Sequence, residues 1–193
     1  MTWWQTLDTT FFHWINGSLS NPVFDALLPL FREKWFWAPL YLFLAAFVWH
    51  NYGNKKGWLF VAGLALAAGL ADFTSSTIIK KNVRRLRPCN DPELRAEVRM
   101  RTACGSGYSF TSSHAANHFA VAVYTASAIG NVLPFGRLLF LSWASLVALA
   151  QVYVGVHYPG DVIGGGMLGA LIGWGAFRVC YKRFRWLRCD IKV

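Results

Sequence analysis

The chain alternates between long apolar stretches and short polar ones. Charged residues are rare or absent in five blocks, which cover residues 35–50, 57–79, 115–136, 138–156 and 162–177. A helix that crosses the hydrocarbon core of a membrane needs about 20 apolar residues, with about 17 near the lower limit. The first and last blocks are marginal by this measure, but aromatic side chains suited to the membrane interface flank both. The pattern predicts an all-α, polytopic membrane bundle with about five transmembrane helices.

The first 34 residues predict helices that lie in the membrane interface. Between Trp3 and Trp14, aromatic and leucine side chains recur at helical spacing with polar residues between them. A second short helix is predicted from Pro22 to Phe31, and no secretory leader is expected. We expect one membrane-integrated domain over residues 1–193, with an interfacial segment 1–34, a transmembrane core 35–179 that includes an outer-face loop 81–113, and a basic cytoplasmic tail 180–193.

Composition and charge support a membrane protein. Hydrophobic residues make up 55% of the 193 residues and charged residues only 15%, which excludes a disordered chain. A soluble bundle with wide apolar core helices is the alternative, but it has no place for ten tryptophans. If five helices cross the membrane in turn, Lys55, Lys56, Arg137 and the basic tail all fall on one side. Because cytoplasmic loops are enriched in Lys and Arg, that side is predicted to be cytoplasmic. The opposite end also carries many basic residues, which favours an anion site and a lipid bilayer rather than nucleic acid as the partner.

Cysteine spacing leaves one question open and excludes a common metal site. Cys89 and Cys104 bracket much of the predicted outer loop, where either a disulfide or two buried free thiols is consistent with the sequence. Cys180 and Cys189 fall in the predicted tail and are expected to be reduced and structural. No Cys-x-x-Cys or Cys/His spacing of the zinc type occurs.

The first polar cluster ends the second apolar block. Its basic residues are Lys80, Lys81, Arg84, Arg85 and Arg87. Such a run often only anchors anionic lipid headgroups. The bidentate guanidinium groups of arginine and the single charge of lysine also suit the binding of the three oxygens of a phosphate group. For this stretch alone, lipid anchoring and phosphate binding both remain open.

The second cluster leads directly into the third apolar block. Ser112 or Ser113 is a natural N-cap, and capping alone would explain it. The free backbone N–H groups of a helix N-terminus also bind anions. His114, in the first turn, is then placed to donate a proton to a leaving oxygen. His118, one turn further on, is expected to be a hydrogen-bonded core histidine.

The third cluster separates the last two apolar blocks. Pro159 disfavours helix at Tyr158, so His157 is expected in a turn and Asp161 in the opening turn of the next helix. A carboxylate near an imidazole fixes its tautomer and raises its basicity, as a nucleophile requires. A purely structural His–Asp pair is the alternative. Three such clusters on one face of the membrane together indicate a catalytic site.

The three clusters together resemble the three-part signature of the type 2 phosphatidic acid phosphatase superfamily, which includes vanadium haloperoxidases. In chain order the motifs read Lys80-x6-Arg87-Pro88, Ser112-x-His114 and His157-x3-Asp161. The resemblance spans roughly residues 35–177. It implies that His157 attacks phosphorus to form a phosphohistidine, while Asp161 holds its other ring nitrogen. His114 would protonate the leaving group. The implied mechanism needs no metal, so we expect no metal and no cofactor. The phosphoryl oxygens would be held by Lys80, Arg87, Ser112 and the amides near Ser113.

Two motifs depart from the family pattern. The usual Pro-Ser-Gly-His reads Thr111-Ser112-Ser113-His114, and Ala150-Gln151 stands where Ser-Arg is usual. Gln151 can donate a hydrogen bond to phosphate but supplies no charge. We expect Arg84 or Arg85 to substitute for the missing arginine, on their nearness in sequence to the first motif. An acid inside a membrane span is rarely without a role, so Asp72 is expected to orient or neutralise a basic group.

The resemblance, with the site at a membrane face, implies a hydrolase: an integral membrane lipid phosphate phosphatase acting on the outer leaflet. The small chain suits a bacterial inner-membrane enzyme of envelope lipid metabolism, with its site facing the periplasm. Undecaprenyl diphosphate is the first candidate substrate, ahead of phosphatidylglycerol phosphate, phosphatidic acid and the phosphate of lipid A. The alternatives are a vanadate-dependent haloperoxidase, whose known members are soluble, and a phospholipid-binding or transport protein that has lost catalysis, with Gln151 as the first sign.

Overall fold

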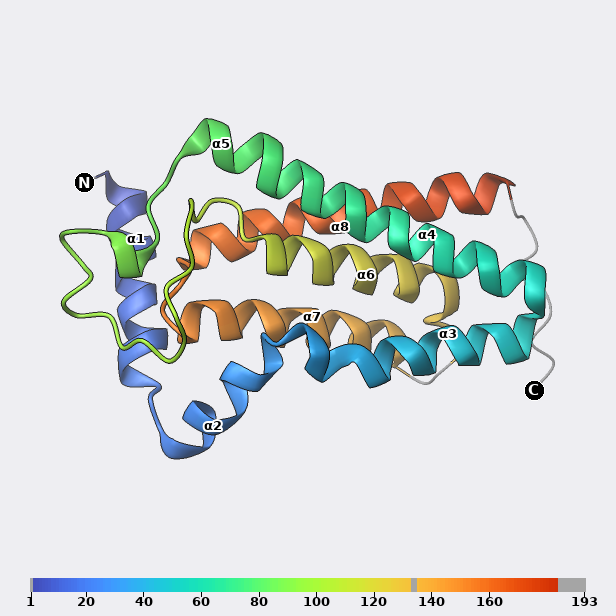
Figure 1. Ribbon diagram of the computed structural model, residues 1–193, viewed down its shortest axis with the longest axis horizontal. Helices are drawn as coiled ribbons and strands as arrows, with labels where there is room; N and C mark the ends of the chain where they lie inside the picture. The colour runs from blue at the N-terminus through green and yellow to red at the C-terminus, as the bar shows by residue number, and fades with distance from the viewer. Residues whose placement is uncertain (1, 133–134, 184–193) are drawn as a thin grey trace.

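The computed structural model describes residues 2–132 and 135–183, and within these ranges every regular element is helical. Five long helices run side by side and form an elongated bundle (Figure 1). They are α3 (Ala38–Tyr52), α4 (Asn54–Asp72), α6 (Ser113–Ile129), α7 (Gly136–Tyr153) and α8 (Pro159–Arg183). The all-α bundle predicted from the apolar blocks is confirmed.

The five helices differ in how well each spans a membrane alone. Within the described residues, three stretches are long and apolar enough, namely Asn54–Asn90, Gly136–Tyr153 and Pro159–Cys180. The last apolar block, marginal in the sequence, extends into a helix of 25 residues. By contrast, α3 has 15 residues and is preceded by a 3-10 turn (Lys34–Trp37). Most of α6 is buried among its neighbours, so its 17 residues face protein more than lipid.

Small residues set the distance between α6 and α8 at the centre of the bundle. Gly165, Gly169 and Gly173 recur every four residues and therefore share one face of α8. A Cβ atom at Gly169 would lie 2.0 Å from the backbone oxygen of Ala116, and one at Gly173 would lie 2.3 Å from that of Ala120. The two backbones approach this closely only because the side chains are absent, as is common between membrane helices.

The N-terminal segment caps one end of the bundle. It consists of α1 (Trp3–His13), a π-helical turn (Trp14–Ser18) and α2 (Pro22–Phe31), whose first turn is capped by Asn21. Figure 1 shows α1 running across the axis of the long helices, and Trp3 is 77% exposed. Both predicted N-terminal helices are confirmed, and the direction of α1 is that expected of a helix in the membrane plane.

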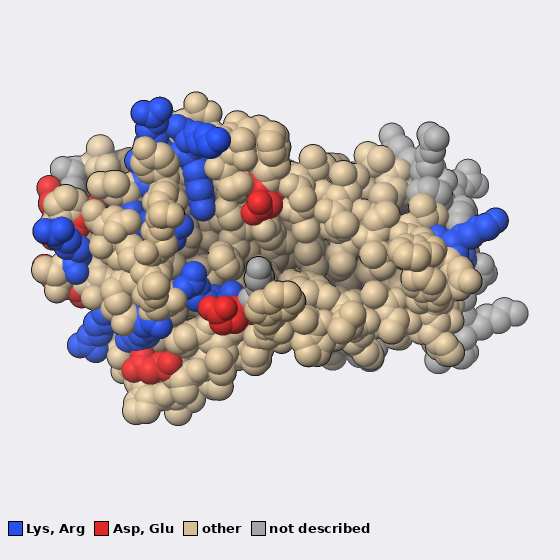
Figure 2. Space-filling view, viewed as in Figure 1, with Lys and Arg blue, Asp and Glu red and all other residues tan. Residues whose placement is uncertain are grey.

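The same end of the bundle carries the long loop between α4 and α6. After α4 the chain continues through a π-helical turn (Phe73–Ile79) into α5 (Lys80–Val83), which stops where Arg84 adopts a left-handed backbone with φ of 53°. We call α1, α2, the loop 84–112 and the loop 154–158 the loop end. Lys and Arg side chains gather there, while the middle of this face is nearly free of charge (Figure 2).

The cysteines of the loop end are bonded to each other. Cys89 and Cys104 form a disulfide with a Cα–Cα distance of 6.0 Å, so the disulfide alternative of the sequence is confirmed. Cys180, near the end of α8, is a half-buried free thiol. Cys189, which the sequence analysis expected to be reduced, and most of the predicted basic tail lie outside the described residues.

Candidate active site

His157 and Asp161 meet where α7 gives way to α8. The connecting turn passes through Gly155, whose φ of 90° favours glycine, and a Cβ atom there would lie 2.7 Å from Val98. Helix α8 then begins at Pro159, as the sequence predicted. His157 Nδ1 lies 3.5 Å from Asp161 Oδ2, and both side chains are buried. This separation is slightly longer than an ordinary hydrogen bond, and catalytic hydrogen bonds commonly tighten on substrate binding.

Two groups besides the histidine hold the side chain of Asp161. Its Oδ2 accepts a hydrogen bond of 2.9 Å from the backbone N–H of Tyr158, and its Oδ1 accepts one of 2.9 Å from Arg85. The other Nη of Arg85 lies 2.6 Å from Asp8 Oδ2, and Asp8 Oδ1 accepts a hydrogen bond from the N–H of Gly160. An Asp8–Arg85–Asp161 network therefore fixes the carboxylate that faces His157.

This network changes the role expected of two arginines. The guanidinium of Arg85 is shared between two carboxylates and lies 3.8 Å above the ring of Tyr158. Arg84 is exposed, and its Nε donates to the backbone oxygen of Lys81. The structure therefore gives both residues contacts other than those of a phosphate ligand. Asp8, 77 residues before Arg85, was not anticipated by any motif.

The environment of His157 keeps its imidazole neutral. Burial lowers the pKa of His157 to about 4, Asp161 opposes this shift, and the positive charges of Arg87 and Lys80 add to it. At neutral pH the ring therefore retains the lone pair that a nucleophile needs. Arg87 and Lys80 of the first motif therefore lie within electrostatic range of the histidine of the third.

The second motif is joined to the third through its backbone. Ser112 caps α6 by accepting a hydrogen bond from the N–H of Ala115, and its own N–H donates to the backbone oxygen of Asp161 at 3.0 Å. Ser113 Oγ lies 2.9 Å from Ser75 Oγ of the π-helical turn. His114 follows in the first turn of α6, within electrostatic range of His157. The structure thus brings together the two histidines predicted to act as nucleophile and acid.

A third basic side chain joins the two of the first motif. Arg32, at the end of α2, lies within electrostatic range of Arg87 and His114. Its Nη1 lies 2.6 Å from Thr102 Oγ1, while the Nε atoms of Arg32 and Arg87 are both buried without a partner in the described chain. Burial lowers the pKa of Arg32. The only sequence signal for it was the excess of positive charge on that face.

Gln151 is fully buried near the end of α7. Neither its Oε1 nor its Nε2 has a hydrogen-bond partner among the described residues. A buried amide without partners is costly and uncommon in a folded protein. Such a group remains a candidate contact for the bound substrate, as the sequence expected.

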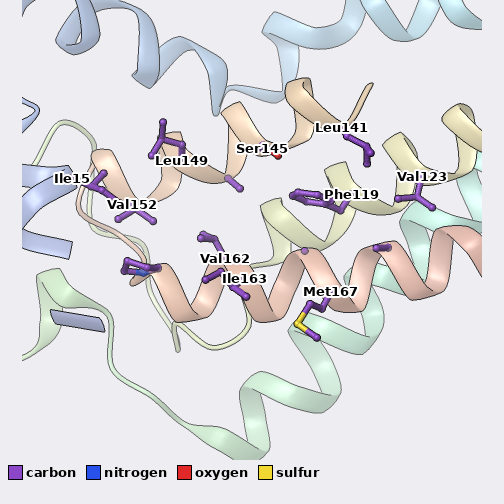
Figure 3. Close-up of a pocket in the computed structure, with 14 residues that line it drawn as sticks. Ile15, Phe119, Val123, Leu141, Ser145, Leu149, Val152, Val162, Ile163 and Met167 are labelled. Atoms are coloured by element: carbon purple, nitrogen blue, oxygen red, sulfur yellow. The ribbon is translucent and has the colours of Figure 1, made fainter. Parts of the chain in front are cut away.

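Two cavities of similar volume open between the helices, and they differ in chemistry. One, of about 490 Å³, lies between α6, α7 and α8, and Ser145 supplies a rare hydroxyl in its otherwise apolar lining (Figure 3). The other, of about 480 Å³, lies between α4 and α6 and reaches Ser113, His114 and Asp72. Only the second is continuous with the predicted chemistry. Across residues 2–132 and 135–183, His, Cys, Asp and Glu form no group of three that could hold a metal.

Comparisons with known proteins agree with this geometry. The chain is 28% identical over 189 residues to a lipid A 4'-phosphatase of Bacteroides thetaiotaomicron, a match that covers 97% of this chain and 83% of the relative. It is 34% identical to a decaprenylphosphoryl-5-phosphoribose phosphatase of Mycobacterium tuberculosis, over 61% of this chain and 68% of the relative. The fold matches that of a transmembrane PAP2-type phosphatidylglycerolphosphate phosphatase from Bacillus subtilis with a TM-score of 0.71, at 21% identity, over 100% of this chain and 90% of the other.

A family model described as the PAP2 superfamily matches residues 56–185, which carry all three motifs. Asp8 and Arg32 lie outside that match, although the fold brings them to the motif residues. Because the matched region is well over half of the sequence, the chain belongs to the PAP2 superfamily, and it is an integral membrane lipid phosphatase.

Proposed function

We propose that the chain removes a phosphate from a glycolipid of the lipid A type, through a phosphohistidine formed on His157. The observation that carries this proposal is the buried Asp8–Arg85–Asp161 network, which holds a neutral His157 opposite His114. The substrate class is favoured by the full-length relative whose name is lipid A 4'-phosphatase.

In the first step the free imidazole nitrogen of His157 attacks phosphorus. A nitrogen–phosphorus bond forms while the bond between phosphorus and the lipid oxygen breaks. His114 gives its proton to that oxygen, so the lipid leaves as a neutral alcohol. Asp161 stabilises the positive charge that the imidazole of His157 acquires, in the manner of a buried acid behind a catalytic histidine.

In the second step water attacks the phosphohistidine. His114, now neutral, accepts the proton of the water, the nitrogen–phosphorus bond breaks, and inorganic phosphate leaves. During both steps the charge on the phosphoryl oxygens is met by Lys80, Arg87 and Arg32, and by the backbone N–H groups at the start of α6. Gln151 adds a neutral hydrogen-bond donor.

The site lies at one end of the bundle, so a lipid keeps its chains in the bilayer while its phosphate reaches the histidines. Lys55 and Lys56, in the first turn of α4, and Arg137, at the start of α7, lie at the opposite end of the bundle. By the positive-inside rule, that opposite end faces the cytoplasm. We therefore place the enzyme in a bacterial inner membrane with its site on the periplasmic face.

A polyprenyl phosphate is the second candidate substrate. The mycobacterial relative, at 34% identity, is named for a decaprenyl-linked phosphate, although it matches a shorter part of the chain. Undecaprenyl diphosphate, the first candidate from the sequence, belongs to this class.

The experiment is phosphate release by the purified protein in detergent, with a chelator present, beside His157→Ala. The substrates are lipid A, undecaprenyl diphosphate, phosphatidylglycerol phosphate and phosphatidic acid. We expect release from lipid A to be fastest and to fall by more than about a thousandfold in the variant, because the nucleophile is gone. A radiolabelled phosphohistidine should be trapped on the wild-type chain alone.

The alternatives give different results. Fastest release from undecaprenyl diphosphate would move the assignment to the polyprenyl class. If no lipid released phosphate above the His157→Ala background while labelled phospholipid still bound, the chain would be a lipid-binding protein rather than an enzyme.

A further inference from the structure

The cavity between α4 and α6 is lined mainly by two helix faces with different properties, and Tyr41 of α3 completes its lining. From α4 come Val61, Leu64, Ala65, Ala68 and Asp72, which share one face because they recur at helical spacing. From α6 come Ser113, His114, Asn117, His118 and Val121, which also share one face. The cavity is therefore apolar along α4 and polar where it approaches His114. We call the polar part, made by Asp72, Asn117 and His118, the acceptor cluster.

His118 contributes an acceptor that the protein does not use. Its Nδ1 lies 2.8 Å from the backbone oxygen of His114. A carbonyl oxygen only accepts, so Nδ1 carries the hydrogen and Nε2 of the neutral ring carries a lone pair. Nε2 is buried without a partner in the described chain, and the residue is 8% exposed. The sequence prediction of a hydrogen-bonded histidine is confirmed for one nitrogen, and the other is uncommitted.

Asn117 and Asp72 contribute further acceptors. Asn117 Nδ2 donates to Asp72 Oδ1 at 3.1 Å, which fixes the amide so that its Oδ1 is the remaining polar atom. That oxygen is buried and has no partner within residues 2–132 and 135–183. Asp72 is a carboxylate, which has acceptor sites beyond the one that Asn117 fills. Its charge also acts on Lys80, as the sequence expected.

Two neighbouring buried acceptors without a donor in the described chain, Asn117 Oδ1 and His118 Nε2, define the ligand that the cluster would bind, and the exposed carboxylate of Asp72 lies beside them. A buried acceptor is costly unless a donor reaches it, so the partner must bring O–H or N–H groups to this position. Because the cluster adjoins His114, those donors must lie close to the phosphate of the substrate.

We infer that the acceptor cluster binds hydroxyl or amide N–H groups of the lipid next to its phosphate, and so selects phosphorylated glycolipids over lipid phosphates without such donors. The inference rests on the proposed phosphatase function and adds the reason for its substrate preference. Phosphatidic acid and undecaprenyl diphosphate have no hydroxyl or amide beside the phosphate, so they leave the cluster unpaired. A site built to hydrogen-bond a substrate group rejects analogues that lack it.

The test uses two synthetic lipids that differ only in their donors. One is a diacylated glucosamine phosphate with free hydroxyl and amide N–H groups, and the other has each hydroxyl methylated and each amide replaced by an ester. We measure the ratio of kcat/KM for the two lipids. The wild-type ratio should exceed about tenfold, and Asn117→Leu and His118→Phe should each lower it by about fivefold or more, since each removes one hydrogen-bond acceptor.

A matched control separates the cluster from a general loss of polar groups. Ser145→Ala also removes a hydroxyl from a cavity between helices, but from the apolar cavity, and should leave the ratio and the rate unchanged. The donor-free lipid, assayed with each preparation, reports whether the variant still folds.

The outcomes distinguish the inference from the function. A wild-type ratio near one would overturn the inference, whatever the variants do, and would leave a phosphatase without this selectivity. Equal losses on both lipids in both variants would also overturn it, because the acceptors would then serve folding or chemistry alone. Absence of phosphate release from either lipid, in wild type and His157→Ala alike, would refute the proposed function itself.

Discussion

The middle of the bundle and the loop end are held together by different forces. In the middle, α8 meets α6 through glycines, with potential Cβ positions as close as 2.0 Å to backbone oxygen. At the loop end, Arg85 joins Asp8 and Asp161, and Arg101 lies against Asp25. Close packing of helix backbones holds the middle of the bundle together, and ion pairs hold the loop end together. The middle therefore sets where the helices stand, and the loop end sets how the reactive groups face one another.

The largest effect is expected from breaking the charge network. Arg85→Met leaves two buried carboxylates without their cation, and removing one partner of a buried ion pair costs about 3–5 kcal/mol. Phosphate release should fall by about a hundredfold or more, because Asp161 loses a contact that orients it. Activity assays and thermal unfolding in detergent measure both effects.

A double variant separates orientation from unpaired charge. Asp8→Asn combined with Arg85→Met removes one of the stranded charges, so the double variant should be more stable than the sum of the single losses predicts. Additive losses would mean that the three residues do not act as one network.

The second prediction concerns the close contact between α6 and α8 in the middle of the bundle. Gly169→Ala places a Cβ atom against the backbone of Ala116 and should lower the stability of the bundle by about 3 kcal/mol, as overpacking does. Gly175→Ala is the matched control, since a Cβ atom there meets nothing within 4 Å. Thermal unfolding of the two variants in the same detergent makes the comparison. Equal midpoints would show that α6 and α8 separate without cost.

A comparable effect should appear on acidification at the loop end. Burial lowers the pKa of His157 from its ordinary value of 6.5 to about 4, so on acidification the unfolded chain binds a proton that the folded chain does not. Stability from this group is complete above pH 6.5 and falls between pH 6.5 and 4, by about 3 kcal/mol in all. Thermal unfolding across that range measures it. In His157→Gln the loss should be smaller, and an identical loss would assign it to other groups.

The smallest effect concerns Arg32. Arg32→Gln removes one positive charge beside Arg87 and His114 and should raise KM by about tenfold, with little change in stability, because one of several phosphate contacts is lost. Arg95→Gln, which changes an exposed arginine of the loop 84–112, is the control and should leave KM unchanged. An unchanged KM in Arg32→Gln would show that this arginine serves the loop through Thr102 alone.

The sequence predicted the middle of the bundle better than the loop end. Apolar blocks locate helices because burial in lipid requires unbroken apolar stretches, and Ser112 and Pro159 mark helix starts through local chemistry. The sequence paired His157 with Asp161 correctly because the two residues are only four positions apart in the chain. Asp8 meets Gly160 across 152 residues, and no local pattern encodes such a contact.

Arg32 and Arg85 also show that nearness in sequence does not determine which charged groups meet in the fold. Nearness in sequence to Arg87 made Arg85 the expected substitute for the missing arginine, but the fold gives its guanidinium to two carboxylates. Arg32 reaches the site because α2 packs under the loop, and its hydrogen bond to Thr102 spans 70 residues. Charge patterns indicate which face is basic, whereas tertiary packing decides which cations meet.

The contact between Asp8 and Gly160 has a consequence for biogenesis. During synthesis Gly160 follows Asp8 by 152 residues. At about 5–20 residues per second, the nascent chain carries the unpaired acid for roughly 8–30 s. The network behind His157 therefore needs both α1 and the start of α8, so a chain that has not yet reached α8 has no finished site.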